Sequence, residues 1–113
     1  MSYLTKIFAS LLLLFFSHGS YAQTSQTDSL ANLLAQKMKD SLSLTSEQKN
    51  QIYTINTTIL TRDSNLRKMF IGSKSLISYL ELLGEQRDSL YKSALPNDKY
   101  LLYLSKKRNI VLY

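Results

Sequence analysis

The stretch LTSEQKNQIYTI, residues 44–55, decides the fold because it reads as the capped start of an amphipathic helix. The hydroxyl of Thr45 can accept a hydrogen bond from the backbone N–H of Gln48, and the Gln48 side chain can reach back to the N–H of Thr45. Leu44, just before this capping box, and Ile52 and Ile55 after it have the spacing of residues that pack on one helix face. The stretch therefore predicts a helix that begins immediately after Thr45.

Apolar residues keep helical spacing through most of the remaining chain, so we expect an all-α protein. The pattern predicts helices over residues 28–41, from the cap at 45 to about 70, from 73 to about 95, and from 98 to about 107. Four such helices predict a small, thin bundle over residues 28–108. Residues 23–27 read as a disordered polar leader, and residues 109–113 read as a short apolar tail.

Three further features of the apolar pattern concern the second helix, the third helix and the tyrosines. The apolar stripe of the second helix is interrupted at residues 62–65, which leaves either a continuous helix or a bend open. In the third helix, Arg87 occupies the one polar position of a seam with coiled-coil-like spacing. Tyr91 and Tyr103 lie on the apolar stripes and are predicted to be buried, whereas Tyr53 and Tyr79 lie off them.

The first 22 residues have the features of a cleavable signal peptide. Lys6 ends a short basic region, and residues 7–16 form an apolar run that is too short for a membrane-spanning helix of about 20 residues. Ser20 and Ala22 place small side chains at the −3 and −1 positions of a cleavage site. We therefore expect export with cleavage after Ala22 and no stable membrane anchor. An uncleaved signal anchor is the alternative.

The composition of the remainder excludes several classes of site. Removal of 22 residues from 113 leaves 91, and loss of Lys6 lowers the net charge from +6 to +5. The one His, His18, is also lost, and the chain has no Cys. Disulfides, common zinc ligand sets and Cys–His or Ser–His catalytic pairs are therefore excluded. We expect a protein without catalytic, cofactor-binding or metal-binding residues, and one that does not bind nucleic acid because no recognition motif is present.

Leu44, Thr45 and Gln48 form the pattern Leu-Thr-x-x-Gln in a basic, helical chain with an export signal. In these respects the chain resembles the Spy/CpxP-like family of periplasmic proteins, which is named for repeats of this motif. A degenerate second repeat follows at Leu95 and Tyr100. There Pro96 replaces the Thr of the motif and Lys99 replaces the Gln, so a second capping box is not expected.

The resemblance implies a thin, curved, four-helix protein that dimerises into a cradle in the periplasm. It further implies a chaperone-like protein that binds unfolded or misfolded envelope proteins without ATP. The alternative is a regulatory protein that binds one envelope partner, such as the sensor domain of a stress response. The candidates for contact with clients combine positive charge with aromatic side chains. They are Lys49, Tyr53, Arg62, Arg67, Lys68 and Tyr79.

Glu81, Glu85 and Asp88 form an acidic face on the third predicted helix, at positions i, i+4 and i+7. Paired carboxylates can act in acid–base catalysis, but no nucleophile or metal ligand accompanies these. We expect them instead to pair with basic residues of the same or the neighbouring helix, namely Arg67, Lys68 or Lys92.

Overall fold

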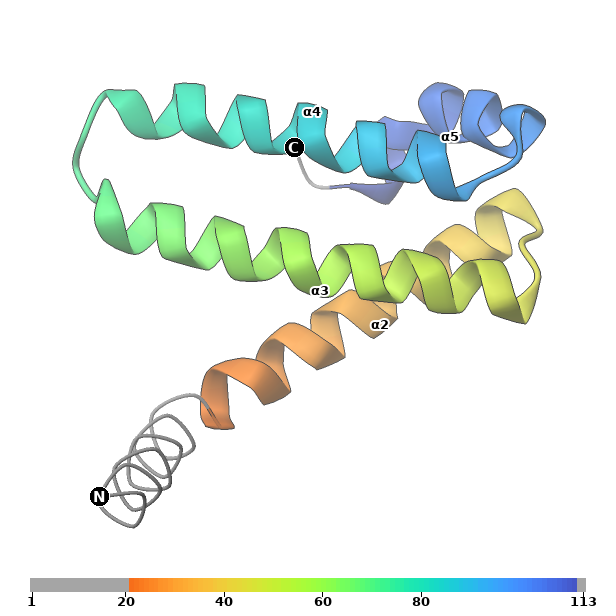
Figure 1. The fold of residues 1–113 in the computed structure, drawn as a ribbon, viewed down its shortest axis with the longest axis horizontal. Coiled ribbons are helices and arrows are strands. Elements are labelled where there is room, and N and C mark those ends of the chain that lie inside the picture. Colours follow the sequence, from red (N-terminus) through yellow and green to blue (C-terminus); the bar gives the residue numbers. More distant parts are fainter. Residues whose placement is uncertain (1–20, 112–113) are drawn as a thin grey trace, which may run out of the picture.

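Residues 21–111 form four helices that are joined by short turns. The computed structural model describes the backbone of these residues and the side chains of residues 25–111. The helices are α2 (Tyr21–Leu42), α3 (Ser46–Met69), α4 (Ser75–Ala94) and α5 (Asn97–Ile110), labelled as in Figure 1. No strand occurs among these residues, and the principal extents are 58 × 38 × 22 Å. The prediction of a small, thin, all-α bundle is confirmed.

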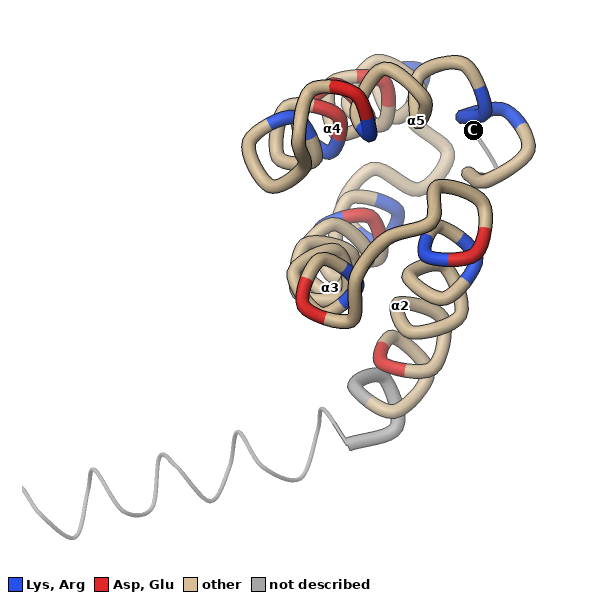
Figure 2. The backbone as a smooth tube through the Cα atoms, turned by 90° about the vertical axis from the view of Figure 1, so that its right-hand side faces the viewer, with Lys and Arg blue, Asp and Glu red and all other residues tan. Residues whose placement is uncertain are grey.

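The helices form a ring in which each contacts its two neighbours. Helix α2 packs on α3, α3 on α4, and α4 on α5, which returns to contact α2. Figure 1 shows α3 and α4 as a long antiparallel hairpin, with α5 beside the end of α4 and α2 crossing α3. A view along the hairpin places α4 and α5 above α3 and α2 (Figure 2). The outer half of the hairpin extends away from α5, so the ring closes only at the other end.

The hydrophobic core lies at the end where all four helices meet. Its largest fully buried side chains are Tyr91, Tyr103, Met38, Leu42 and Ile52. The rings of Tyr91 and Tyr103 pack edge to face with centroids 5.0 Å apart, which is a favoured geometry for aromatic pairs. The predicted burial of both tyrosines is confirmed, and Arg87, the polar residue of the predicted seam, is also buried. In contrast, no side chain from residue 60 to residue 82 is buried.

The capping box at the start of α3 is present as the sequence predicts. The N–H of Gln48 donates to Thr45 Oγ1 over 3.1 Å, and the N–H of Thr45 donates to Gln48 Oε1 over 2.9 Å. Leu44, directly before the cap, is buried in the core. The local hydrogen bonds therefore start the helix, and the buried leucine attaches that start to the rest of the bundle.

Two lysines of α5 bind the C-terminal end of α2. Lys99 Nζ donates to the carbonyl of Leu42, and Lys106 Nζ donates to the carbonyl of Ser41, each over 2.9 Å. The last carbonyls of a helix have no partner within the helix and carry a partial negative charge, so a cation is favourable there. These two contacts close the ring between α5 and α2.

The N-terminal boundary of α2 differs from the prediction. Helix α2 begins at Tyr21, so residues 23–27 are helical, whereas the sequence predicted a disordered leader. These residues include neither Pro nor Gly, so no helix-breaking residue separates them from the helix that follows. The predicted signal peptide, residues 1–22, lies outside the described residues except for its last two positions.

The structure shows whether α3 bends at residues 62–65 and what the first residues of the C-terminal tail do. Helix α3 is continuous through residues 62–65, where Arg67 Nε donates to Asp63 Oδ1 over 2.7 Å and supports the helix from one turn to the next. Helix α5 continues to Ile110, and both Ile110 and Val111 are buried in the core. The described part of the apolar tail therefore belongs to the bundle.

Replacing Thr45 by Ala is expected to lower the free energy of unfolding by about 0.5–2 kcal/mol, because the N–H of Gln48 loses its acceptor. Thr45→Ser keeps the hydroxyl and serves as the matched control, with stability close to that of the unmodified protein. Urea denaturation followed by circular dichroism measures both variants. Equal stability of Thr45→Ala and Thr45→Ser would show that the cap does not stabilise α3.

Candidate functional site

The outer half of the α3–α4 hairpin is closed at its tip by a turn and an aromatic contact. Gly72 has a φ of 74°, a left-handed conformation that glycine adopts without strain. The rings of Phe70 and Tyr79 stack with centroids 4.4 Å apart. Ser73 Oγ accepts a hydrogen bond from the N–H of Ser75 over 3.2 Å at the start of α4. The tip is thus held by local contacts, and no other helix of the ring contributes to it.

A groove of about 440 Å³ lies between the two arms of this hairpin. Each arm contributes residues at positions i, i+3, i+4 and i+7, which lie on one face of a helix. The lining residues are Arg62, Asn65, Leu66 and Met69 from α3, and Tyr79, Leu82, Leu83 and Gln86 from α4. Leucines and a methionine make much of its walls apolar. Arg62 and Gln86 form the polar end of the groove, and Tyr79 lies at the other end, near the tip of the hairpin.

The hairpin carries much of the exposed apolar surface of the protein. Met69 is 72% exposed and Ile71 is 83% exposed, and Ile77, Tyr79 and Leu82 are also exposed. Scattered exposed leucines are ordinary, but several large apolar side chains beside a groove are typical of an interaction site. We therefore take the hairpin groove, defined by its eight lining residues, as the candidate functional site.

Arg62 is the charged member of the groove lining. Its Nη1 donates to Gln86 Oε1 over 3.2 Å, so the two arms are linked across the polar end of the groove. Both side chains are exposed at this point. Acidic and basic residues are otherwise interspersed along the four helices, as the coloured positions in Figure 2 show.

The structure brings together only two of the six predicted contact residues. Arg62 and Tyr79 both line the groove. Arg67 forms an ion pair with Asp63 on α3, and neither Arg67 nor the exposed Lys68 is among the lining residues. Lys49 and Tyr53 belong to the opposite end of α3, where Tyr53 is half-buried against the core.

The prediction missed the apolar part of the groove and its two amides. The helical spacing places four apolar residues on the faces that line the groove, namely Leu66, Met69, Leu82 and Leu83. The two amides, Asn65 and Gln86, lie at neighbouring positions. The signal that could have found them is the matching spacing on two adjacent helices. Their meeting in one groove depends on the register of the hairpin.

The leucines and the tyrosine singled out by the sequence motif lie in or against the hydrophobic core. Leu44 and Leu95 are each 6% exposed and belong to the same core cluster, and Tyr100 packs against it. Pro96 is the N-cap residue of α5 and makes no side-chain cap hydrogen bond, in contrast to Thr45. The stretches that begin at Leu44 and at Leu95 therefore each start a helix and attach that start to the core.

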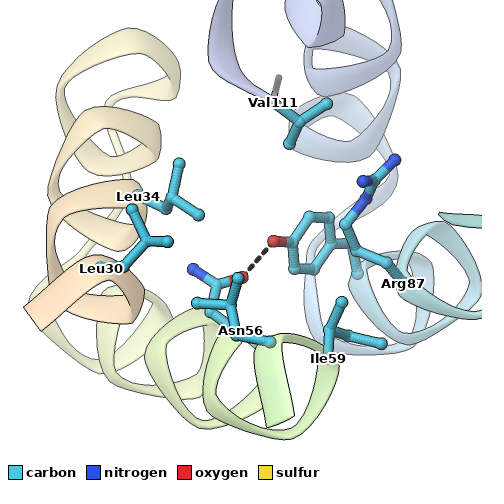
Figure 3. Close-up of a pocket in the computed structure, with 8 residues that line it drawn as sticks. Leu30, Leu34, Asn56, Ile59, Arg87 and Val111 are labelled. Carbon is cyan, nitrogen blue, oxygen red and sulfur yellow. Dashed lines mark hydrogen bonds between the residues drawn. The ribbon is translucent and has the colours of Figure 1, made fainter. Parts of the chain in front are cut away.

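A buried polar contact connects three helices beside the core. Asn56, only 2% exposed, accepts a hydrogen bond from the hydroxyl of Tyr91, drawn as the dashed line in Figure 3. Its Nδ2 donates to the carbonyl of Ala31 over 3.2 Å. The adjoining pocket has a volume of about 40 Å³, which suits a few water molecules at most, so we do not consider it a ligand site.

Asp88 joins α4 to α5. It accepts hydrogen bonds from the Tyr103 hydroxyl over 2.7 Å, from Arg87 Nε over 3.2 Å and from Lys107 Nζ. The expectation that it pairs with Arg67, Lys68 or Lys92 is therefore wrong. The partner helix on this side is α5, and the sequence spacing of α4 alone does not reveal that.

The environment of Asp88 favours its charged form. Burial by itself raises the pKa of this carboxyl, but the hydrogen bonds from Lys107 and Tyr103 and the charges of Arg87 and Lys107 outweigh it, so the pKa of Asp88 is lowered. For Tyr103, burial and the hydrogen bond to Asp88 raise the pKa of the hydroxyl. Both groups are therefore in the protonation states that this contact requires, and their role is structural.

Within residues 21–111 there is no cluster of three or more His, Cys, Asp and Glu side chains that could hold a metal ion. Among the described helices, none is long and apolar enough to span a membrane. No family model, curated protein or solved structure matches this chain.

Acidification is expected to destabilise the protein partly through Asp88. A carboxyl whose pKa is lowered by folding stabilises the folded state above the unfolded pKa of about 3.9, and this contribution is lost as the pH falls through the folded pKa. Unfolding free energies measured by urea denaturation from pH 6 downward should fall less steeply for Asp88→Asn than for the unmodified protein. Glu85→Gln, which removes an exposed charge from the same helix, is the control. Identical pH profiles for Asp88→Asn and the unmodified protein would contradict this role.

Proposed function

We propose that this protein is exported to the periplasm and binds unfolded or misfolded envelope proteins there without ATP, using the hairpin groove. The observation that supports the proposal most directly is the groove itself, which is largely apolar and is covered by neither α2 nor α5. The signal-peptide pattern of residues 1–22 and the resemblance to the Spy/CpxP-like family support export and the class of function. A homodimer is part of the same proposal.

The chemistry of the hairpin suits loose binding of many segments. Leu82 and Met69 offer apolar contact, Tyr79 offers an aromatic face with a polar hydroxyl, and Arg62 offers charge and hydrogen-bond donors. Tyr and Arg are the residue types that contribute most at protein interfaces. Binding of this kind requires no bond to be made or broken, so neither a nucleophile nor a nucleotide is needed.

A regulatory protein with one envelope partner is the second candidate. The observation that favours it is the limited size and definite shape of the groove, since a single groove of about 440 Å³ can select one partner segment. The range of clients separates the two functions. A chaperone protects unrelated proteins from aggregation, whereas a regulator binds its own partner only.

Aggregation of two unrelated unfolded proteins, followed by light scattering, is expected to slow in the presence of the purified protein. The double variant Met69→Ser, Leu82→Ser should lose most of this protection, because it removes apolar contact area at the groove. The matched control is Leu33→Ser, Leu101→Ser, which removes two exposed leucines elsewhere on the surface. The proposed function would be contradicted if the purified protein protected neither of the two unfolded proteins. It would also be contradicted if both double variants lost protection equally.

Positive charge is expected to act mainly on the rate of encounter with acidic clients. Exposed charges are screened beyond about 8 Å at physiological ionic strength, so added salt should slow association much more than it speeds release. Replacing Arg62, Arg67 and Lys68 together by Gln should reproduce this effect at low salt. Stopped-flow binding to an unfolded acidic protein measures both rates. Association that is insensitive to salt in both proteins would rule out electrostatic capture.

A further inference from the structure

The hairpin groove presents the same spacing on both of its walls. Residues 62, 65, 66 and 69 of α3 face residues 79, 82, 83 and 86 of α4, so each wall is two turns of a helix. Seven positions of a helix rise about 10 Å. The groove therefore has the length of two turns of a third helix laid along the pair. In the closed half of the ring, further helices already pack against α3 and α4.

An extended segment would fit this groove poorly. About three extended residues cover 10 Å, and each brings a backbone N–H and a carbonyl that need partners. The polar side chains of the lining are Arg62, Asn65, Gln86 and the hydroxyl of Tyr79. The acceptor oxygen of Gln86 is already bonded to Arg62, which keeps its other donors, so few acceptors remain for the N–H groups of an extended segment. A helix satisfies its own backbone and presents only side chains to the apolar walls. The groove thus favours a helical occupant.

The charge of the lining indicates the chemistry of that occupant. Arg62 carries the positive charge, and neither Glu81 nor Glu85 of α4 is among the lining residues. A guanidinium can hold a carboxylate through two parallel hydrogen bonds, which a neutral side chain cannot match. A carboxylate beside the apolar face of a bound helix would complement Arg62 at the polar end of the groove.

We infer that the hairpin groove binds an acidic amphipathic helix, with apolar residues at i, i+3 or i+4, and i+7 and a carboxylate beside them. The inference rests on the proposed function, because it names the class of segment that the same groove takes. The bound helix replaces the third helix that the outer half of the hairpin lacks. Arg62, at the polar end of the groove, holds the carboxylate of the bound helix.

Three fluorescein-labelled peptides of one composition and about 16 residues, long enough to form a helix when bound, test this inference. The first is an acidic amphipathic sequence with the required spacing, and the second is a scrambled order without that spacing. The third keeps the spacing but has two central prolines, which the other two carry at their ends. Fluorescence anisotropy with the purified protein gives Kd, and circular dichroism gives helix formation. The first peptide is expected to bind at least tenfold more tightly than the others and to gain helix signal.

Variants of the protein test whether the peptide binds in the groove. Leu82→Ser should raise Kd for the first peptide at least fivefold, whereas Leu101→Ser, an exposed leucine of α5, should leave it unchanged. Arg62→Gln should weaken the acidic peptide severalfold but not its Glu→Gln counterpart. Arg108→Gln removes the same charge from an exposed position of α5 outside the groove lining, and is expected to bind like the unmodified protein at physiological salt.

Equal affinities for the three peptides, or tight binding without a gain of helix signal, would overturn the inference. Insensitivity of the first peptide to Leu82→Ser would also overturn it, because the helix would then bind elsewhere. Each of these results leaves the proposed function intact if the protein still slows aggregation and the double variant Met69→Ser, Leu82→Ser still loses that protection. Loss of that protection, measured in the separate assay, would instead defeat the proposed function.

Discussion

The buried hydrogen bond between Tyr91 and Asn56 is the contact on which the arrangement of the bundle depends. A buried amide costs free energy unless its polar atoms have partners, and Asn56 finds them on two other helices. Helix α3 can therefore take only a position in which α4 supplies the Tyr91 hydroxyl and α2 supplies the Ala31 carbonyl. This requirement is more selective than apolar packing, which tolerates sliding of one helix along another.

The contacts of α5 complete the ring on the same principle. Asp88 receives donors from Tyr103 and Lys107, while Lys99 and Lys106 reach the final carbonyls of α2. Each of these contacts pairs a charge with groups that would otherwise lack a partner. A helix of only 14 residues is thereby held between two longer ones.

Concentrating the polar and apolar contacts at one end leaves the outer hairpin with two helices. Two helices can bury only the faces that they turn toward each other, so Met69, Ile71 and Leu82 remain exposed. The stacked Phe70 and Tyr79 keep the arms together at the tip. A thin bundle built from a short chain thus leaves an open, largely apolar groove between α3 and α4, and this groove connects the fold with the proposed function.

The sequence by itself determined the features that depend on neighbouring turns. The capping box of Thr45 and Gln48 and the burial of Tyr91 and Tyr103 follow from spacings of three or four residues, which a single helix imposes. The tertiary structure alone decided which helices meet. It gave Asp88 its partners on α5, placed Arg62 beside Gln86 in the groove that Tyr79 and Leu82 also line, and separated Lys49 and Tyr53 from that groove. These contacts join residues far apart in the chain, so they depend on how helices cross and on their register, which local spacing does not specify.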